Sequence, residues 1–491
     1  MVNNVRVKSR PPGMPSNSIQ STGAGERLVR RPFMGFWQNN QDILANASSL
    51  AASTAVTSVL GFAFWAYAAH LFSQRAVGFG SAAVSAMTVL GTIGMFGLNT
   101  LLIGELPRRE SRAGLISAAL AAAGLGCMLL GAGFAFVTPF FSSRFVEIIG
   151  SPEPAFIFIA GAVLIGVSLV FDQATIGLLR GKLQLWRNAI FAAAKLLILP
   201  AVTVVFHAQL GLGITFSWVV GAAVSLAIIA LYLRLHGDPV LPRPDWGLLR
   251  GLGRLTMIHN WLNLAITVPW MLLPVLVTVT VSPAANAAFY AAWTLSGFLR
   301  VVPTHLATVL FAIAAADPQA VAGKLRFSLR ISLIIGIPGI AILGLGSHII
   351  LNLFGPNYAN EATVTLWLLC LGYIPTIPKV HYIAVCRATG HIKRAAVVLT
   401  STATMEVAAA VVGAMLGGLN GLSAALLFGF IVEGLITTPR VWRAASGRGR
   451  HRPSRGGGRH RLEGQGRGFS GRRTLQPAVL ARDRVSHARA G

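Results

Sequence analysis

Long apolar stretches alternate with short polar connections along most of this chain. About 20 apolar residues in a helix cross the hydrocarbon layer of a bilayer, and each stretch has nearly that length or more. The pattern therefore predicts twelve transmembrane helices. The stretches are Ser48–Leu71, Val77–Ile103, Ala113–Val137, Ala155–Leu179, Asn188–His207, Leu212–Leu233, Thr256–Val281, Asn286–Ala316, Ile331–Phe354, Ala362–Val385, Ala395–Leu416 and Leu422–Thr438.

The composition agrees with this pattern. Of the 491 residues, 54% are hydrophobic and only 11% are charged, and the mean hydropathy is +0.66. A soluble chain of this length needs far more charge on its surface. The expected fold class is an all-α polytopic membrane protein, with about twelve helices in two six-helix lobes around a central cavity.

The positive charge is distributed unevenly between alternate connections. The net charge is +26, and 13 of the 41 basic residues follow residue 440. Connections after even-numbered helices are basic, whereas the opposite connections contain only Arg75 and Arg144. This asymmetry predicts that both termini are cytoplasmic in the plasma membrane, and it argues against nucleic-acid binding. The basic connections contain Arg108, Arg109, Arg112, Arg180, Lys182, Arg187, Arg234, Arg243, Arg250, Arg254, Lys324, Arg326, Arg330, Arg387, Lys393 and Arg394.

Two weakly related halves are expected on either side of the long Pro-rich connection. The segment around Phe79 resembles the segment around Phe289 in spacing, so helices one and two correspond to seven and eight. Related halves about a midplane site are typical of transporters. The tail is interpreted either as an anionic-lipid contact or as a nonfunctional extension. The expected divisions are a disordered leader 1–42, a first lobe 43–235, a linker 236–253, a second lobe 254–440 and a disordered basic tail 441–491.

Arg300 is the most unusual charge in the predicted helices. It lies about 20 Å along the stretch 286–316, near the centre of a ~30 Å layer. A cation at that depth costs on the order of 3 kcal/mol and normally faces a protein interior or a wet cavity. Pro303 and His305 lie on the same stretch, and His259 lies on the preceding one. We interpret this pair of helices as a cavity wall, the alternative being a structural ion pair of Arg300.

Other ionisable residues also fall within predicted helices. Asp172 and Lys195 lie on consecutive helices and are expected to form an ion pair, although Lys195 is also a candidate substrate ligand. Glu406 is either the partner of Arg300 or an acid that couples transport to an ion. Lys379 adds a cation, whereas Glu433 is expected to be an ordinary interfacial acid. Because cations dominate this set, an anionic substrate with phosphate is expected.

No sequence pattern indicates catalysis or a cofactor. The three cysteines lie in apolar stretches, an arrangement that favours neither disulfides nor a metal site. Nucleophile elbows, phosphate-binding loops and zinc-ligand spacings are lacking. The chain is therefore expected to be a transporter without enzymatic activity, metal or cofactor.

Two segments resemble the polysaccharide (oligosaccharide) flippase family, within the superfamily that also contains multidrug exporters. They are VGFGSAAVSAMTVLGTIGMFGLNTLLIGELPR and LFGPNYANEATVTLWLLCLGYIPTIPKVHYIAVCRATGHIKRAA. The second contains the external stretch Gly355, Tyr358 and Glu361–Ala362. The resemblance covers Ser48 to about Arg440, and it implies export of a polyprenyl-pyrophosphate-linked glycan. Such a transporter could act as a monomer beside glycan-assembly enzymes.

The sequence is also compatible with other functions. A drug or small-solute antiporter is the main alternative, and a polytopic glycan polymerase or ligase is a second. The short external connections argue against the enzyme, because such enzymes usually carry a large external domain. A membrane scaffold is a further alternative, although a scaffold has no need for Arg300 and Glu406 at the midplane.

Overall fold

The computed structural model describes residues 41–106, 112–178, 180–206, 211–237, 243–247, 253–316 and 321–447. Nearly all of the leader and of the tail, including the predicted lipid contact, lies outside these residues. The described residues form helices and no strand, which confirms the all-α expectation. Nine of these helices have the length and apolar composition of a membrane span, and the bent pair α15–α16 adds a tenth.

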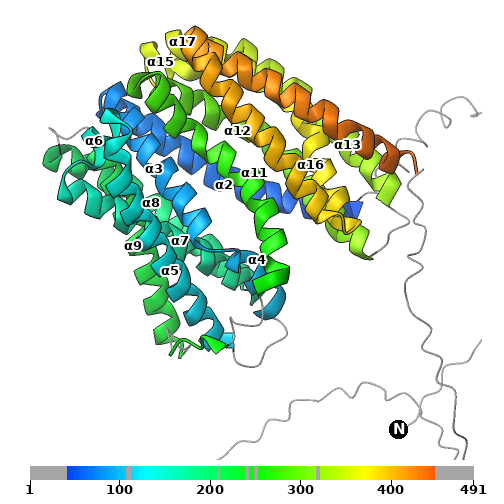
Figure 1. The fold of residues 1–491 in the computed structure, drawn as a ribbon, viewed down its shortest axis with the longest axis horizontal. Coiled ribbons are helices and arrows are strands. Elements are labelled where there is room, and N and C mark those ends of the chain that lie inside the picture. The colour runs from blue at the N-terminus through cyan, green and yellow to red at the C-terminus, as the bar shows by residue number, and fades with distance from the viewer. Residues whose placement is uncertain are drawn as a thin grey trace, which may run out of the picture. The chain divides into compact units, whose positions relative to one another are not determined.

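The first set of helices follows the chain from α2 to α9. Their apolar stretches end mainly at polar or glycine-containing turns, as the hydropathy pattern predicts. Helix α7 packs against α5, α8 and α9, α8 packs against α9, and α3 packs against α5, α7 and α9 (Figure 1). The bounds are α2 Gln41–Leu71, α3 Gln74–Gly94, α4 Leu98–Glu105, α5 Arg112–Val137, η2 Thr138–Phe140, α6 Ser143–Ile149, α7 Pro152–Gly177, α8 Gly181–Val205 and α9 Leu212–Leu235.

The second set extends from α11 to α17 and forms the other lobe. Helix α17 contains two helices, because Gly417 and Gly418 have non-helical backbone angles where the pattern predicts a connection. The predicted total of twelve spans remains a prediction. The bounds are α11 Gly253–Thr280, α12 Pro283–Ala316, α13 Val321–Leu345, α14 Ser347–Asn352, α15 Pro356–Leu371, α16 Tyr373–Ala388 and α17 Ile392–Ala445.

Three predicted spans are interrupted. The stretch Val77–Ile103 breaks between α3 and α4, where Gly97 adopts a left-handed φ of 78°. A Cβ at Gly97 would meet the side chain of Asn260 on α11, so glycine also permits close packing there. The stretch Ile331–Phe354 breaks at Gly346. The stretch Ala362–Val385 bends by 43° between α15 and α16, and Pro378 lies within α16.

The two lobes meet along α2, α3, α11 and α12. At the end of the bundle that carries Arg75 and Arg144, several polar contacts join them. Arg144 on α6 donates to the carbonyls of Thr278 and Val279 at distances of 2.7 and 2.8 Å. Asn286 on α12 donates to the Gly78 carbonyl at 2.8 Å, and a Cβ at Gly78 would overlap the Pro283 carbonyl. We call these contacts the interlobe latch.

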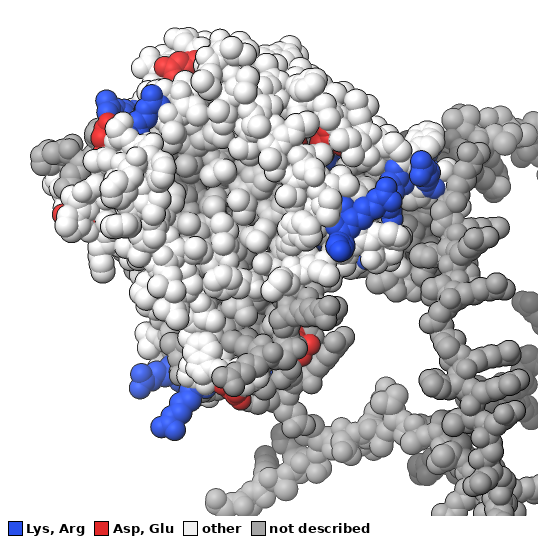
Figure 2. Space-filling model, viewed as in Figure 1, with Lys and Arg blue, Asp and Glu red and all other residues white. Residues whose placement is uncertain are grey.

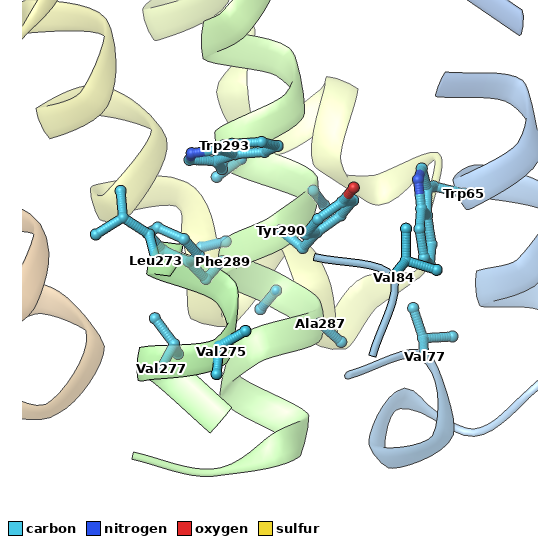
Figure 3. Packing of buried hydrophobic residues seen from close by; sticks show 14 of the residues in the cluster. Trp65, Val77, Val84, Leu273, Val275, Val277, Ala287, Phe289, Tyr290 and Trp293 are labelled. Carbon is cyan, nitrogen blue, oxygen red and sulfur yellow. The ribbon is translucent and has the colours of Figure 1, made fainter. Parts of the chain in front are cut away.

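A large apolar core passes between the lobes. It includes Phe79 and Phe289, both fully buried, which are the two residues that the internal resemblance aligns. Figure 3 shows Phe289 beside Leu273 and below Trp293. The exterior is also largely apolar. Figure 2 shows a mostly uncharged face on which the visible Lys and Arg side chains lie near the margins. Such a surface suits contact with lipid.

Candidate functional site

Two adjoining cavities share a wall at Arg300: the larger lies between the lobes, and the smaller lies within the second lobe. The larger, with a volume of about 650 Å³, is lined by α2, α9, α11 and α12. The smaller, with a volume of about 300 Å³, is lined by α11, α12, α16 and α17. Both cavities share Trp270, Met271, Arg300 and Thr304. Arg300 therefore lies at the boundary between them.

The lining of α12 follows from helical periodicity. Tyr290, Trp293, Gly297, Arg300 and Thr304 recur at spacings of three and four residues and all line the larger cavity. Residues at this spacing share one face of a helix. The sequence therefore contained a signal for the aromatic lining, but the aromatic residues were not predicted as part of the site.

Arg300 has no hydrogen-bond partner for two of its nitrogen atoms. Within the described part of the chain, its Nε and Nη2 atoms are buried and unpartnered. The guanidinium carbon lies 3.5 Å from the centroid of the Trp270 ring and 5.5 Å from that of Phe430. A cation–π contact contributes about 2 kcal/mol when desolvated, whereas burying a charge costs several kcal/mol. The aromatic rings thus compensate only part of the cost, and the carboxylate of Glu406, beyond ion-pair distance but close enough to interact with this charge, compensates a further part.

An ion pair with Arg300 was one of the two alternatives predicted for Glu406, and it does not form in the described structure. Across the described residues, the structure shows no contact of 4.0 Å or less between these two charged groups. Glu406 lines the smaller cavity, and its Oε1 atom is buried without a hydrogen-bond partner. The remaining alternative, an acid that couples transport to an ion, stays a proposal.

Lys379 and Glu433 form a buried ion pair. Their charged atoms lie 2.6 Å apart, and the Glu433 side chain is only 2% exposed. Thr402 also donates to the Glu433 carboxylate. Glu433 was expected to be an ordinary interfacial acid, and this expectation is wrong because α17 continues well beyond it to Ala445. Lys379 lines the smaller cavity but already has a carboxylate partner.

The predicted ion pair between Asp172 and Lys195 does not form. Arg187 donates instead to both oxygens of Asp172, at 2.7 Å each. Asp172 lies near the end of α7 and Arg187 near the start of α8, so they face each other across the turn. Lys195 lies eight residues further along α8, about 12 Å deeper. Arg187 was assigned to a connection because its helix begins before the apolar stretch does.

Lys195 is enclosed by aromatic rings instead. Its Nζ atom lies 3.8 Å from the centroid of a Trp218 ring and 4.6 Å from those of Phe64 and Phe191. Only 3% of the residue is exposed. It lines neither of the two cavities, although Trp218 lines the larger one.

The two predicted histidines have different surroundings. His305 lines the larger cavity, and its Nε2 atom lies 2.9 Å from the Thr54 hydroxyl on α2. This contact joins the lobes near the opposite end of α12 from the interlobe latch. His259 lines neither cavity and lies close enough to Arg387 to interact with its charge. The structure thus brings together Arg300, His305, Lys379 and Glu406 but leaves His259, Lys195 and Asp172 outside the cavities.

Comparisons with known proteins agree on the architecture. Residues 43–311, more than half of the chain, match the family model described as polysaccharide biosynthesis protein. A search of curated proteins found no match. The fold is similar to an inward-facing multidrug resistance MATE family transporter of the MOP superfamily, with a TM-score of 0.63 and 14% identity over 80% of this chain and 95% of the other.

Two further solved structures show the same fold. One is a MOP superfamily transporter from Pyrococcus furiosus, described as having a binding pocket of reverse polarity that suggests a different function. Its TM-score is 0.56, with 13% identity over 82% of this chain and 96% of the other. The other is a MATE structure in complex with MaL6, with a TM-score of 0.54, 14% identity and coverage of 82% and 96%.

Proposed function

This chain belongs to the polysaccharide biosynthesis protein family, and we propose that it is a flippase for a lipid-linked oligosaccharide or polysaccharide precursor. The lipid would be a polyprenyl pyrophosphate. Transport would occur by alternating access across the plasma membrane, with both termini in the cytoplasm as the connection charges indicate. The protein would have no enzymatic activity of its own. It could work as a monomer beside glycan-assembly enzymes.

One observation carries this proposal: the buried guanidinium of Arg300 between two cavities. Its Nε and Nη2 atoms are free of partners in the described residues, and these are the donors of a bidentate contact to phosphate. Aromatic stacking on Trp270 holds the guanidinium plane in place. A diphosphate would replace the missing partners while its polyprenyl chain stays in the bilayer.

Neighbouring residues would have distinct roles in this proposal. His305 would donate to the headgroup after its contact with Thr54 breaks. Lys379 would contribute positive potential while it remains paired with Glu433. Glu406 would couple transport to a bound ion or proton. His259 and Lys195, which lie outside both cavities, would act only indirectly.

A drug antiporter is the second candidate. The aromatic lining of the larger cavity favours it, because flat apolar cations bind well to tryptophan faces. The unpartnered guanidinium argues against it, because a cationic substrate would be repelled by Arg300.

Reconstitution separates the two candidates. Purified protein in vesicles would be given a fluorescent short-chain polyprenyl diphosphate bearing one N-acetylhexosamine, and separately the drug cation ethidium. The flippase proposal predicts protein-dependent translocation of the lipid-linked sugar and none of ethidium. Ethidium transport without sugar-lipid translocation would replace the flippase by the antiporter.

A further inference from the structure

Five aromatic rings form a continuous series across the larger cavity. Trp218 lies 5.8 Å from Trp65, which lies 4.7 Å from Tyr290, between ring centroids. Tyr290 lies 5.3 Å from Trp293, which stacks on Trp270 at 4.9 Å. All five rings line the same cavity. We call this series the aromatic belt.

A buried cation lies at each end of the aromatic belt. Lys195 packs on Trp218 in the first lobe, and Arg300 packs on Trp270 in the second. The rings come from α2, α9, α11 and α12, so the belt crosses the interface between the lobes. Figure 3 shows the middle of the belt, where Tyr290 lies between Trp65 and Trp293.

Polar groups without partners accompany these rings. The Nε1 atom of Trp293 and the hydroxyl of the neighbouring Thr294 are buried and have no hydrogen-bond partner among the described residues. Both residues line the larger cavity. A buried donor without a partner loses the hydrogen bonds that water would give it, which destabilises the folded protein. A purely apolar ligand would leave this cost in place, whereas a ligand with hydroxyl groups would remove it.

A sugar ring matches this combination of surfaces. Its C–H face packs on the electron-rich face of an aromatic ring, and its hydroxyl groups accept and donate hydrogen bonds at the rim. A polyprenyl chain has no such groups. Resting on the proposed function, we propose that the aromatic belt is the saccharide subsite, holding the first sugars while Arg300 holds the diphosphate.

The cavity is large enough for a short saccharide. A volume of about 650 Å³ is within the range of about 300–1,000 Å³ that small-molecule pockets occupy. One or two sugars next to the diphosphate would therefore fit against the aromatic belt.

Binding of two matched probes tests the aromatic belt. The probes are farnesyl diphospho-N-acetylglucosamine and farnesyl diphosphate, titrated against the full-length protein in nanodiscs by calorimetry. The wild-type protein should bind the sugar-bearing probe about tenfold more tightly than the sugarless probe. Trp293→Leu should remove that tenfold difference and leave binding of farnesyl diphosphate within about twofold. Trp293→Phe keeps the ring but loses the N–H donor, so it should retain part of the difference.

Trp442→Leu provides the matched control, because Trp442 is 73% exposed and lies outside both cavities. It should bind both probes as the wild type does. Equal affinity of the wild type for the two probes overturns the saccharide subsite and leaves the proposed function standing. If Trp293→Leu weakens the binding of both probes equally, the saccharide subsite is also overturned. A wild type that binds neither probe contradicts the proposed function and the saccharide subsite together.

Discussion

The guanidinium of Arg300 stacks on the indole of Trp270, with 3.5 Å between the guanidinium carbon and the ring centroid. The two residues come from α12 and α11, and both line the two cavities at once. This stacking orients a buried cation without neutralising it. The cation therefore faces both cavities, as the proposed binding of a diphosphate requires.

The buried pair of Asp172 and Arg187 is expected to stabilise the first lobe. Removing one member leaves the other charge buried without a partner, which costs about 3–5 kcal/mol. Arg187→Met should therefore lower the thermal unfolding temperature in detergent strongly. Exchanging the two residues, Asp172→Arg with Arg187→Asp, should recover much of the loss. Lys195→Met in the same assay tests the pairing of Asp172 with Lys195. If Lys195→Met lowers the unfolding temperature as much as Arg187→Met does, and the exchange restores none of it, Arg187 is not the partner of Asp172.

The interlobe latch is expected to open during transport. Asn286 also donates to the Ser81 hydroxyl at 2.9 Å, so these two side chains meet across the lobes and are the positions at which paired cysteines test the contact. The three native cysteines are buried and would first be replaced by alanine. Ser81→Cys with Asn286→Cys should block transport when oxidised and regain it on reduction. Transport that continues in the fully oxidised protein would show that the lobes do not separate there.

Glu406 is expected to connect the smaller cavity to an ion. Its Oε1 atom has no hydrogen-bond partner in the described structure, and the residue packs against Gly429. Glu406→Gln keeps the shape of the side chain but removes its charge. Transport by this variant should lose its dependence on an imposed proton or sodium gradient while the unfolding temperature changes little. Unaltered gradient dependence would exclude Glu406 as the coupling acid.

Sequence patterns predicted much of the architecture but few of the side-chain contacts between helices. Hydropathy identified the apolar helices, and depth alone identified Arg300, because both depend on position along a single helix. The partner of Asp172 was missed because the predicted span began at Asn188, one residue after Arg187, whereas α8 begins at Gly181. Glu433 was predicted to be interfacial for a similar reason: the predicted span ended at Thr438, whereas α17 continues to Ala445. Both predictions failed because the ends of these helices are less apolar than their centres, so hydropathy placed the helix ends too early or too late.

The aromatic belt shows a different limit. The face of α12 that carries Tyr290, Trp293 and Arg300 can be read from their spacing. The rings that complete the belt come from α2, α9 and α11, and only the packing of the two lobes brings them together. Contacts between helices that are distant in the chain are not encoded in the period of any one of them.

Binding of a diphosphate by Arg300 tests the central proposal most directly. The measurement is the affinity of farnesyl diphosphate for wild type, Arg300→Lys and Arg300→Ala in nanodiscs, with Lys182→Ala as the control because Lys182 lies at the start of α8, outside both cavities. Arg300→Ala should weaken binding by a hundredfold or more, which corresponds to about 3 kcal/mol. Arg300→Lys should retain part of the affinity, because the charge remains and the bidentate geometry is lost. An Arg300→Ala protein that remains folded and binds as tightly as the wild type would contradict the account.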